Sequence, residues 1–124
     1  MNLQRIQKEF AQAKDRFAFV ELHPTVGGGV FAKAALQTIS SLYVLSIRFP
    51  DTYPNEMPRV TVDTPAITNS PHRYTQGHIC FLHPSMWNPG IHDLTFVIGR
   101  AAKWLNKYEV WRVRGTWPGA EIKH

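Results

Sequence analysis

The stretch YVLSIRFPDTYPNEMPRVTV, residues 43–62, carries the clearest structural pattern of the chain. Its first seven residues alternate between two faces, which predicts a strand with one buried side. In residues 50–58 a proline stands at every fourth position, and proline neither continues a helix nor donates to a sheet ladder. Residues 60–62 are again of strand type. The stretch therefore predicts two strands joined by a stiff loop. The face expected to be buried carries Tyr43, Leu45, Ile47 and Phe49.

Two more strands are expected before this stretch, at residues 19–22 and 30–37. His-Pro and the triple glycine at residues 27–29 separate them. The glycines lack the downstream Gly-Lys-Ser/Thr of a phosphate-binding loop, and no helical pattern follows them, so we expect a turn. Short connections between four consecutive strands favour an antiparallel meander.

A helix is expected at each end of the strands. Residues 2–17 carry apolar side chains at steps of three and four, with Gln, Lys, Glu and Asp, Glu9 among them, on the opposite face. Asp93 can cap a second helix over residues 94–108. Residues 111–119 are expected to form a turn-rich tail that is too aromatic to lie free in solvent. The core is expected to include Phe49, Trp87, Trp104 and Tyr108. The order of helix, four strands, irregular segment and helix predicts an α+β sandwich with the first helix packed on the sheet.

Length, composition and charge narrow the function classes. A chain of 124 residues predicts one domain, residues 1–124. No apolar run approaches the ~18 residues of a membrane span, and the first residues contain no signal-peptide core, so we expect a cytoplasmic protein. The 14 Lys and Arg exceed the 9 Asp and Glu, but they are dispersed without interleaved aromatic residues. This pattern argues against nucleic acid and is compatible with an acidic protein partner.

The only cysteine, Cys80, lies in the irregular residues 64–89. A long loop of this kind in a small domain is more often functional than a linker. A single cysteine forms no internal disulfide, so a buried filler, a metal ligand and a nucleophile are the alternatives. The proline-rich loop setting favours an exposed, reactive thiol over a buried filler.

Three motifs resemble those of ubiquitin-conjugating enzymes. They are FPxxYPxxxPxV at residues 49–60, GxIC at residues 77–80 and WxP at residues 87–89. Each motif is weak alone, but the three occur in the family's order with nearly its spacing, and the likeness covers residues 1–108. The resemblance implies that family's fold, with an N-terminal helix on a four-stranded antiparallel meander, an active-site loop and a C-terminal helix.

Two departures from the family pattern resemble the prokaryotic branch of the superfamily. Residues 70–72 read Ser-Pro-His where the family usually has His-Pro-Asn, so His72 occupies the asparagine position. The chain is too short for the family's two last helices and ends in GxWPGxExxH, residues 115–124. Members of that branch occur in cyclic-oligonucleotide antiphage signalling operons. The implied donor is the C-terminus of a cGAS-like nucleotidyltransferase, or otherwise a ubiquitin-like protein.

The chemistry of the cysteine segment fits an acyl carrier. A thiolate attacks a thioester readily, and the new thioester stays open to attack by an amine. A nearby imidazole or positive charge favours thiolate formation. His72 can donate to the oxyanion or act as a base, because imidazoles titrate near neutral pH. We therefore predict Cys80 and His72 as catalytic residues, with no metal or organic cofactor and with ATP consumed by an activating partner, if one exists.

Several alternatives remain open at this point. His78 and His83 are each at least as consistent with a surface histidine as with a catalytic one. Together with Cys80 they offer three zinc ligands, but no distant ligand pair accompanies them. A cysteine hydrolase would need Asp63 or Asp93 to orient His72. A non-catalytic adaptor for ubiquitin-like proteins would share the fold, although such variants typically lose the cysteine.

Overall fold

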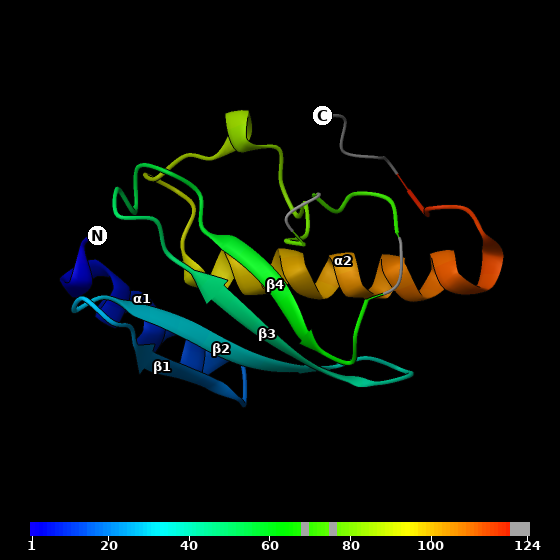
Figure 1. Ribbon diagram of the computed structural model, residues 1–124, viewed down its shortest axis with the longest axis horizontal. Helices are drawn as coiled ribbons and strands as arrows, with labels where there is room; N and C mark the ends of the chain where they lie inside the picture. Colours follow the sequence, from blue (N-terminus) through cyan, green and yellow to red (C-terminus); the bar gives the residue numbers. More distant parts are fainter. Residues whose placement is uncertain (68–69, 75–76, 120–124) are drawn as a thin grey trace.

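A computed structural model describes residues 1–67, 70–74 and 77–119. These residues form helices and strands in the expected order (Figure 1). The elements are α1 (Leu3–Arg16), β1 (Val20–Pro24), β2 (Val30–Gln37), β3 (Leu42–Arg48), β4 (Arg59–Thr64), the 3-10 helix η1 (Pro84–Met86) and α2 (Leu94–Arg114).

The four strands form one antiparallel sheet in the order β1-β2-β3-β4, so the predicted meander is confirmed. The predicted alternation along β3 is also confirmed, because Tyr43, Leu45, Ile47 and the following Phe49 are all buried. β1 runs two residues further than expected, to Pro24. Proline is tolerated there because β1 is an edge strand and Pro24 is its last residue.

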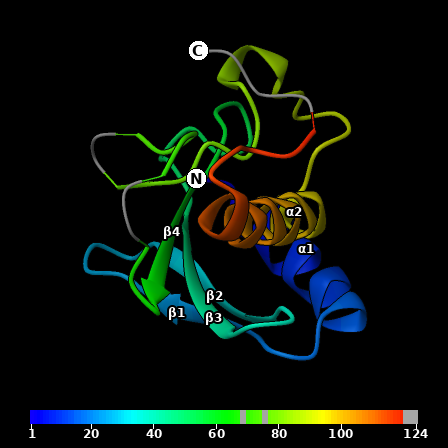
Figure 2. The same cartoon turned by 90° about the vertical axis from the view of Figure 1, so that its right-hand side faces the viewer.

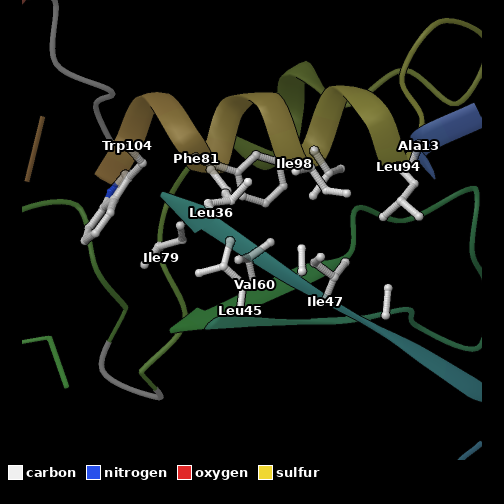
Figure 3. Packing of buried hydrophobic residues seen from close by; sticks show 14 of the residues in the cluster. Ala13, Leu36, Leu45, Ile47, Val60, Ile79, Phe81, Leu94, Ile98 and Trp104 are labelled. Carbon is white, nitrogen blue, oxygen red and sulfur yellow. The ribbon is translucent and has the colours of Figure 1, made fainter. Parts of the chain in front are cut away.

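Both helices lie on the same side of the sheet, with α1 beside α2 (Figure 2). In the core, Ile98 and Leu94 of α2 face the buried side chains of β3 and β4 (Figure 3). Ile79 and Phe81 enter the same core from the segment that contains the cysteine. That segment is therefore held between the sheet and α2 by burial of its apolar side chains.

One polar residue of α1 departs from the predicted amphipathic pattern. Glu9 was expected on the solvent face, but it is 5% exposed. It lies three residues after Ile6 and four before Ala13, both fully buried, and so shares their helical face. Its carboxylate accepts hydrogen bonds from the Tyr53 hydroxyl at 2.5 Å and the Leu94 amide at 2.8 Å. The carboxylate thus ties α1 to the proline-rich loop and to the first turn of α2.

The C-terminal helix is longer than expected. Trp111 continues the row formed by Trp104 and Tyr108, so residues 111–114 are helical and not part of the turn-rich tail. Gly115, with φ 79°, ends the helix in the left-handed conformation that glycine adopts without strain. No helix among the described residues has the length and apolar character needed to cross a bilayer.

Trp87 was expected in the core, but it is only half-buried. Its indole N–H donates to the Pro54 carbonyl at 2.8 Å, which explains why the ring stays at the edge of the core. The bond joins the segment after the cysteine to the proline-rich loop.

Candidate active site

The cysteine segment is fixed to the sheet and to α2 on either side of Cys80. The Ile79 amide donates to the Val60 carbonyl of β4 at 2.8 Å. The Phe81 carbonyl accepts from Nε of Arg100 on α2 at 3.2 Å. The irregular loop is therefore held in place at the residue where reactivity was predicted.

A short antiparallel pairing places Cys80 opposite His72. The Cys80 amide donates to the His72 carbonyl at 2.8 Å, and the Tyr74 amide donates to the His78 carbonyl at 2.9 Å. Alternate residues of paired extended segments face the same side, so Tyr74 and Cys80 share a face. Residues separated by eight positions in the sequence are thus brought together by local backbone hydrogen bonds.

His72 adopts an unusual backbone conformation, with φ 59°. Histidine is among the few side chains that tolerate this left-handed region, as is the asparagine that the family pattern has at this position. The His72 carbonyl also accepts from the Trp104 indole N–H at 3.1 Å, and its ring packs edge-on against Trp117 at 4.9 Å. Positive φ values of this kind cluster at functional sites, where the surrounding structure compensates for their cost.

Cys80 and His72 border one small hollow of about 40 Å³. A volume of this size admits water but not a peptide. Trp117, which follows the C-terminal helix, also lines it and packs against Trp104 with 5.4 Å between the ring centroids. The expectation that the aromatic tail is not free in solvent is thereby confirmed. The hollow is lined by His72, Cys80, Phe81, Arg100, Lys103, Trp104, Lys107 and Trp117.

The expectation of an exposed thiol is wrong, because Cys80 is only 1% exposed. The apolar neighbours Ile79 and Phe81 draw the segment into the core and carry the cysteine with them. Burial raises the pKa of the Cys80 thiol, while the hydroxyl of Tyr74, 3.5 Å from the sulfur, acts in the opposite direction. The thiol also donates to the Leu82 carbonyl at 3.8 Å. In this conformation Cys80 is therefore a protonated thiol at neutral pH.

Tyr74 is a site residue that sequence reasoning missed. Its hydroxyl donates to the Cys80 sulfur, and burial together with this bond raises the pKa of Tyr74 to about 12. The hydroxyl therefore stays protonated and able to donate at neutral pH. The even separation of the two residues, together with Gly77 between them, was a signal for a tight hairpin with both side chains on one face.

The other nearby histidines do not line the hollow that Cys80 borders. His78 stacks on Tyr74 at 4.2 Å, and burial, with a contribution from Arg59, lowers the pKa of its imidazole. His83 caps η1, where its Nδ1 accepts from the Ser85 amide at 3.2 Å. Neither lines the hollow of about 40 Å³.

These positions bear on the zinc alternative. Across residues 1–67, 70–74 and 77–119, no three His, Cys, Asp or Glu side chains gather in a way that could hold a metal ion. His92 also has a local role, because its Nδ1 accepts from the Asn88 amide at 2.9 Å.

The two acids considered for a hydrolase triad are engaged elsewhere. Asp63 accepts from the Ser46 hydroxyl at 2.6 Å on the outer face of the sheet. Asp93 caps α2 by accepting from the Phe96 amide at 2.9 Å, as its sequence position predicted.

Comparisons with known proteins bear on the family and the fold of the chain. A family model described as "Type II CBASS E2 protein" matches residues 8–124. Ubiquitin-conjugating enzyme 15 of Arabidopsis thaliana is 43% identical over 51 residues. The matched segment makes up 40% of this chain and only 30% of that protein. A solved complex of the Vps23 UEV with ubiquitin is similar with a TM-score of 0.59 and 16% identity, over 85% of this chain and 84% of that one. This last likeness concerns the fold alone.

Proposed function

The chain belongs to the family of type II CBASS E2 proteins, and from this premise we propose that it carries a donor protein as a thioester on Cys80 and transfers it to an amine in antiphage defence. The donor would be the C-terminus of a cGAS-like nucleotidyltransferase or of a ubiquitin-like protein. The observation that carries the proposal is that Cys80, the only cysteine, borders one hollow with His72 and three basic side chains.

In the loading step, the thiolate of Cys80 attacks the activated carbonyl at the donor's C-terminus. A carbon–sulfur bond forms, and the bond to the activating group breaks with its electron pair. Tyr74 supports this step, because its hydroxyl already donates to the sulfur and can stabilise the thiolate. No metal or organic cofactor enters the step.

In the transfer step, an amine attacks the thioester carbonyl and the sulfur leaves. We assign His72 to this step, either as a donor to the oxyanion or as the base that removes the proton of the amine. Its fixed backbone and its place opposite Cys80 support the assignment. One oxyanion donor is typically worth about 2.7–4 kcal/mol.

Loading requires the hollow to open. A donor tail does not fit into about 40 Å³, and the buried thiol is protonated at neutral pH. Displacement of Trp117 would admit the tail and bring water to the sulfur, which removes the main cause of the raised pKa of Cys80. Trp117 therefore separates a resting form from a reactive form in this proposal.

A ubiquitin-binding adaptor is the second candidate function. The fold likeness to the Vps23 UEV, which was solved with ubiquitin, and the burial of Cys80 favour it. An adaptor does not need a histidine with positive φ directly opposite a cysteine, so we rank it second.

The proposal is tested by intact mass of the protein purified with the products of neighbouring genes and ATP. Wild type should carry a protein adduct that a thiol reductant removes, Cys80→Ser a reductant-resistant ester, and Cys80→Ala no adduct. Release of the donor to water without transfer to any amine would indicate a hydrolase. Absence of any adduct, with the partners still bound, would indicate the adaptor.

A further inference from the structure

One face of α2 beside the candidate site is strongly basic. Arg100, Lys103 and Lys107 are spaced by three and four residues, so their side chains follow one line along the helix. All three line the hollow that Cys80 borders. We call these three residues the basic ridge.

The charges of the basic ridge are not compensated within the described part of the chain. The ion pairs found there involve Arg5, His23 and Lys33, and none includes a member of the ridge. Arg100 donates to the Phe81 carbonyl and approaches the ring of Phe96, and no acidic side chain among the described residues pairs with its positive charge. Like charges three and four residues apart repel each other, so binding of an anion along the ridge would be favourable.

The pKa of the Cys80 thiol is raised by burial although the ridge lies beside it. The three cations therefore do not keep the sulfur deprotonated in this conformation.

The length of the basic ridge matches a short stretch of extended peptide. Residues 100–107 rise by roughly 10 Å along the helix at about 1.5 Å per residue. An extended chain covers that distance in about three residues. A donor tail whose terminal carbonyl reaches Cys80 would thus present the few residues before its end to the ridge.

We propose that the basic ridge recognises acidic side chains within about the last five residues of the donor's C-terminal tail. The inference rests on the proposed function and specifies its substrate class. The ridge attracts the tail, and its charge pairs select donors whose acidic side chains precede the terminal carbonyl.

The test uses synthetic hexapeptides that end in a glycine thioester of N-acetylcysteamine, a neutral leaving group. The Cys80 thiolate displaces the N-acetylcysteamine thiolate, one carbon–sulfur bond replaces another, and solvent protonates the leaving group. Three peptides differ only at the second and fourth positions before the glycine, which are Glu, Gln or Lys. The acylation rate of Cys80 is followed by intact mass at 0.05 M and 0.5 M salt.

We expect the Glu peptide to react about tenfold faster than the Gln peptide at low salt, and the Lys peptide more slowly than both. The difference should fall to about twofold at 0.5 M salt, because such charges are screened. Lys103→Glu with Lys107→Glu should reverse the order of the peptides. Lys8→Glu with Lys14→Glu on α1 changes the net charge equally and should leave the order unchanged. Arg100 is kept because it also holds the Phe81 carbonyl.

Each other outcome has a distinct meaning. Equal rates for the three peptides would overturn the role of the ridge while leaving the thioester function intact. No acylation by any peptide, although a small alkylating agent modifies Cys80, would overturn both. A 20-nucleotide RNA that blocks acylation at a concentration equal to that of the peptide would assign the ridge to nucleic acid and overturn the inference.

Discussion

Glu9 and Cys80 are both buried side chains with an ionisable group, but their surroundings differ. Glu9 is held by short hydrogen bonds of 2.5–2.8 Å from the Tyr53 hydroxyl, the Leu94 amide and Arg5. The bonds that Cys80 makes with Tyr74 and Leu82 are longer, at 3.5 and 3.8 Å. Glu9 joins elements of the fold, whereas Cys80 borders a hollow with basic walls.

The difference contrasts a buried group that ties elements of the fold together with a buried thiol at the proposed reactive site. A buried carboxylate with several donors loses its role when any donor moves, so its surroundings must be rigid. A buried thiol costs little as a small apolar group, and it can be uncovered when a neighbouring side chain moves away. Substitutions at the two sites should therefore affect different measurements.

The largest expected effect is on stability, at Glu9. Glu9→Ala leaves the Tyr53 hydroxyl and the Leu94 amide buried without their acceptor, and should cost about 3–5 kcal/mol in denaturant unfolding. Glu9→Gln keeps the oxygen that accepts from Tyr53 and Leu94 and replaces only the oxygen that faces Arg5 with an amide group. It should therefore cost less. Folded Glu9→Gln protein should still form the Cys80 adduct. If it did not, the two sites would not be separable.

The next effect is on transfer, at His72. His72→Ala should slow discharge of the thioester to an amine about 100-fold, because it removes one donor or base from the reacting centre. His72→Asn retains a donor and tolerates the positive φ, so recovery in this variant would assign the oxyanion role and failure would assign the base role. Unfolding midpoints are the control. Discharge of His72→Ala within twofold of wild type would contradict any role in transfer.

A smaller effect is expected on the pH dependence of thiol reactivity. Burial raises the pKa of Cys80, so the unreactive thiol dominates at pH 7 and the alkylation rate should rise with pH beyond the range of an ordinary cysteine, pKa about 8.5. Trp117→Ala should increase the rate at pH 7 about tenfold and shift the profile to lower pH, since one pH unit corresponds to tenfold. An unchanged profile in Trp117→Ala would show that this ring does not control access to the sulfur.

The smallest effect is expected at Tyr74. Tyr74→Phe removes one donor to the sulfur and should raise the apparent pKa of Cys80 slightly, with a loading rate lower by about threefold to tenfold at pH 7. The phenyl ring preserves the stack on His78, so the unfolding midpoint should change little. A faster loading rate in this variant would indicate that the hydroxyl restrains the thiol and does not activate it.

The sequence predicted the fold well where a periodic pattern of apolar side chains indicated which face is buried. The alternation in residues 43–49 predicted the face of β3, and the three motifs predicted the family and the neighbourhood of Cys80. The helical position of Glu9, on the same face as Ile6 and Ala13, indicates burial. Its charge led to the opposite prediction, because charged side chains are rarely buried. Its charged partner Arg5 lies four residues away, but the Tyr53 hydroxyl and the Leu94 amide lie 44 and 85 residues away, and such long-range contacts have no local signal.

The position of Trp117 beside the site could not be predicted either. Trp117 reaches His72 only because α2 continues to Arg114 before Gly115 ends it, and the end of a helix depends on tertiary packing as well as on local preference. Loop composition suggested an exposed thiol, but two apolar neighbours decided its burial.

The most direct test of the central claim is to locate the donor on the chain. Trypsin releases residues 74–100 as one peptide, because no Lys or Arg lies between Arg73 and Arg100, and this peptide contains the only cysteine position. In Cys80→Ser isolated with its donor and ATP, tandem mass spectrometry should find the donor's C-terminal residue joined as an ester to residue 80. An adduct on any other residue, or an unmodified peptide 74–100 in protein that has bound its donor, would contradict the account.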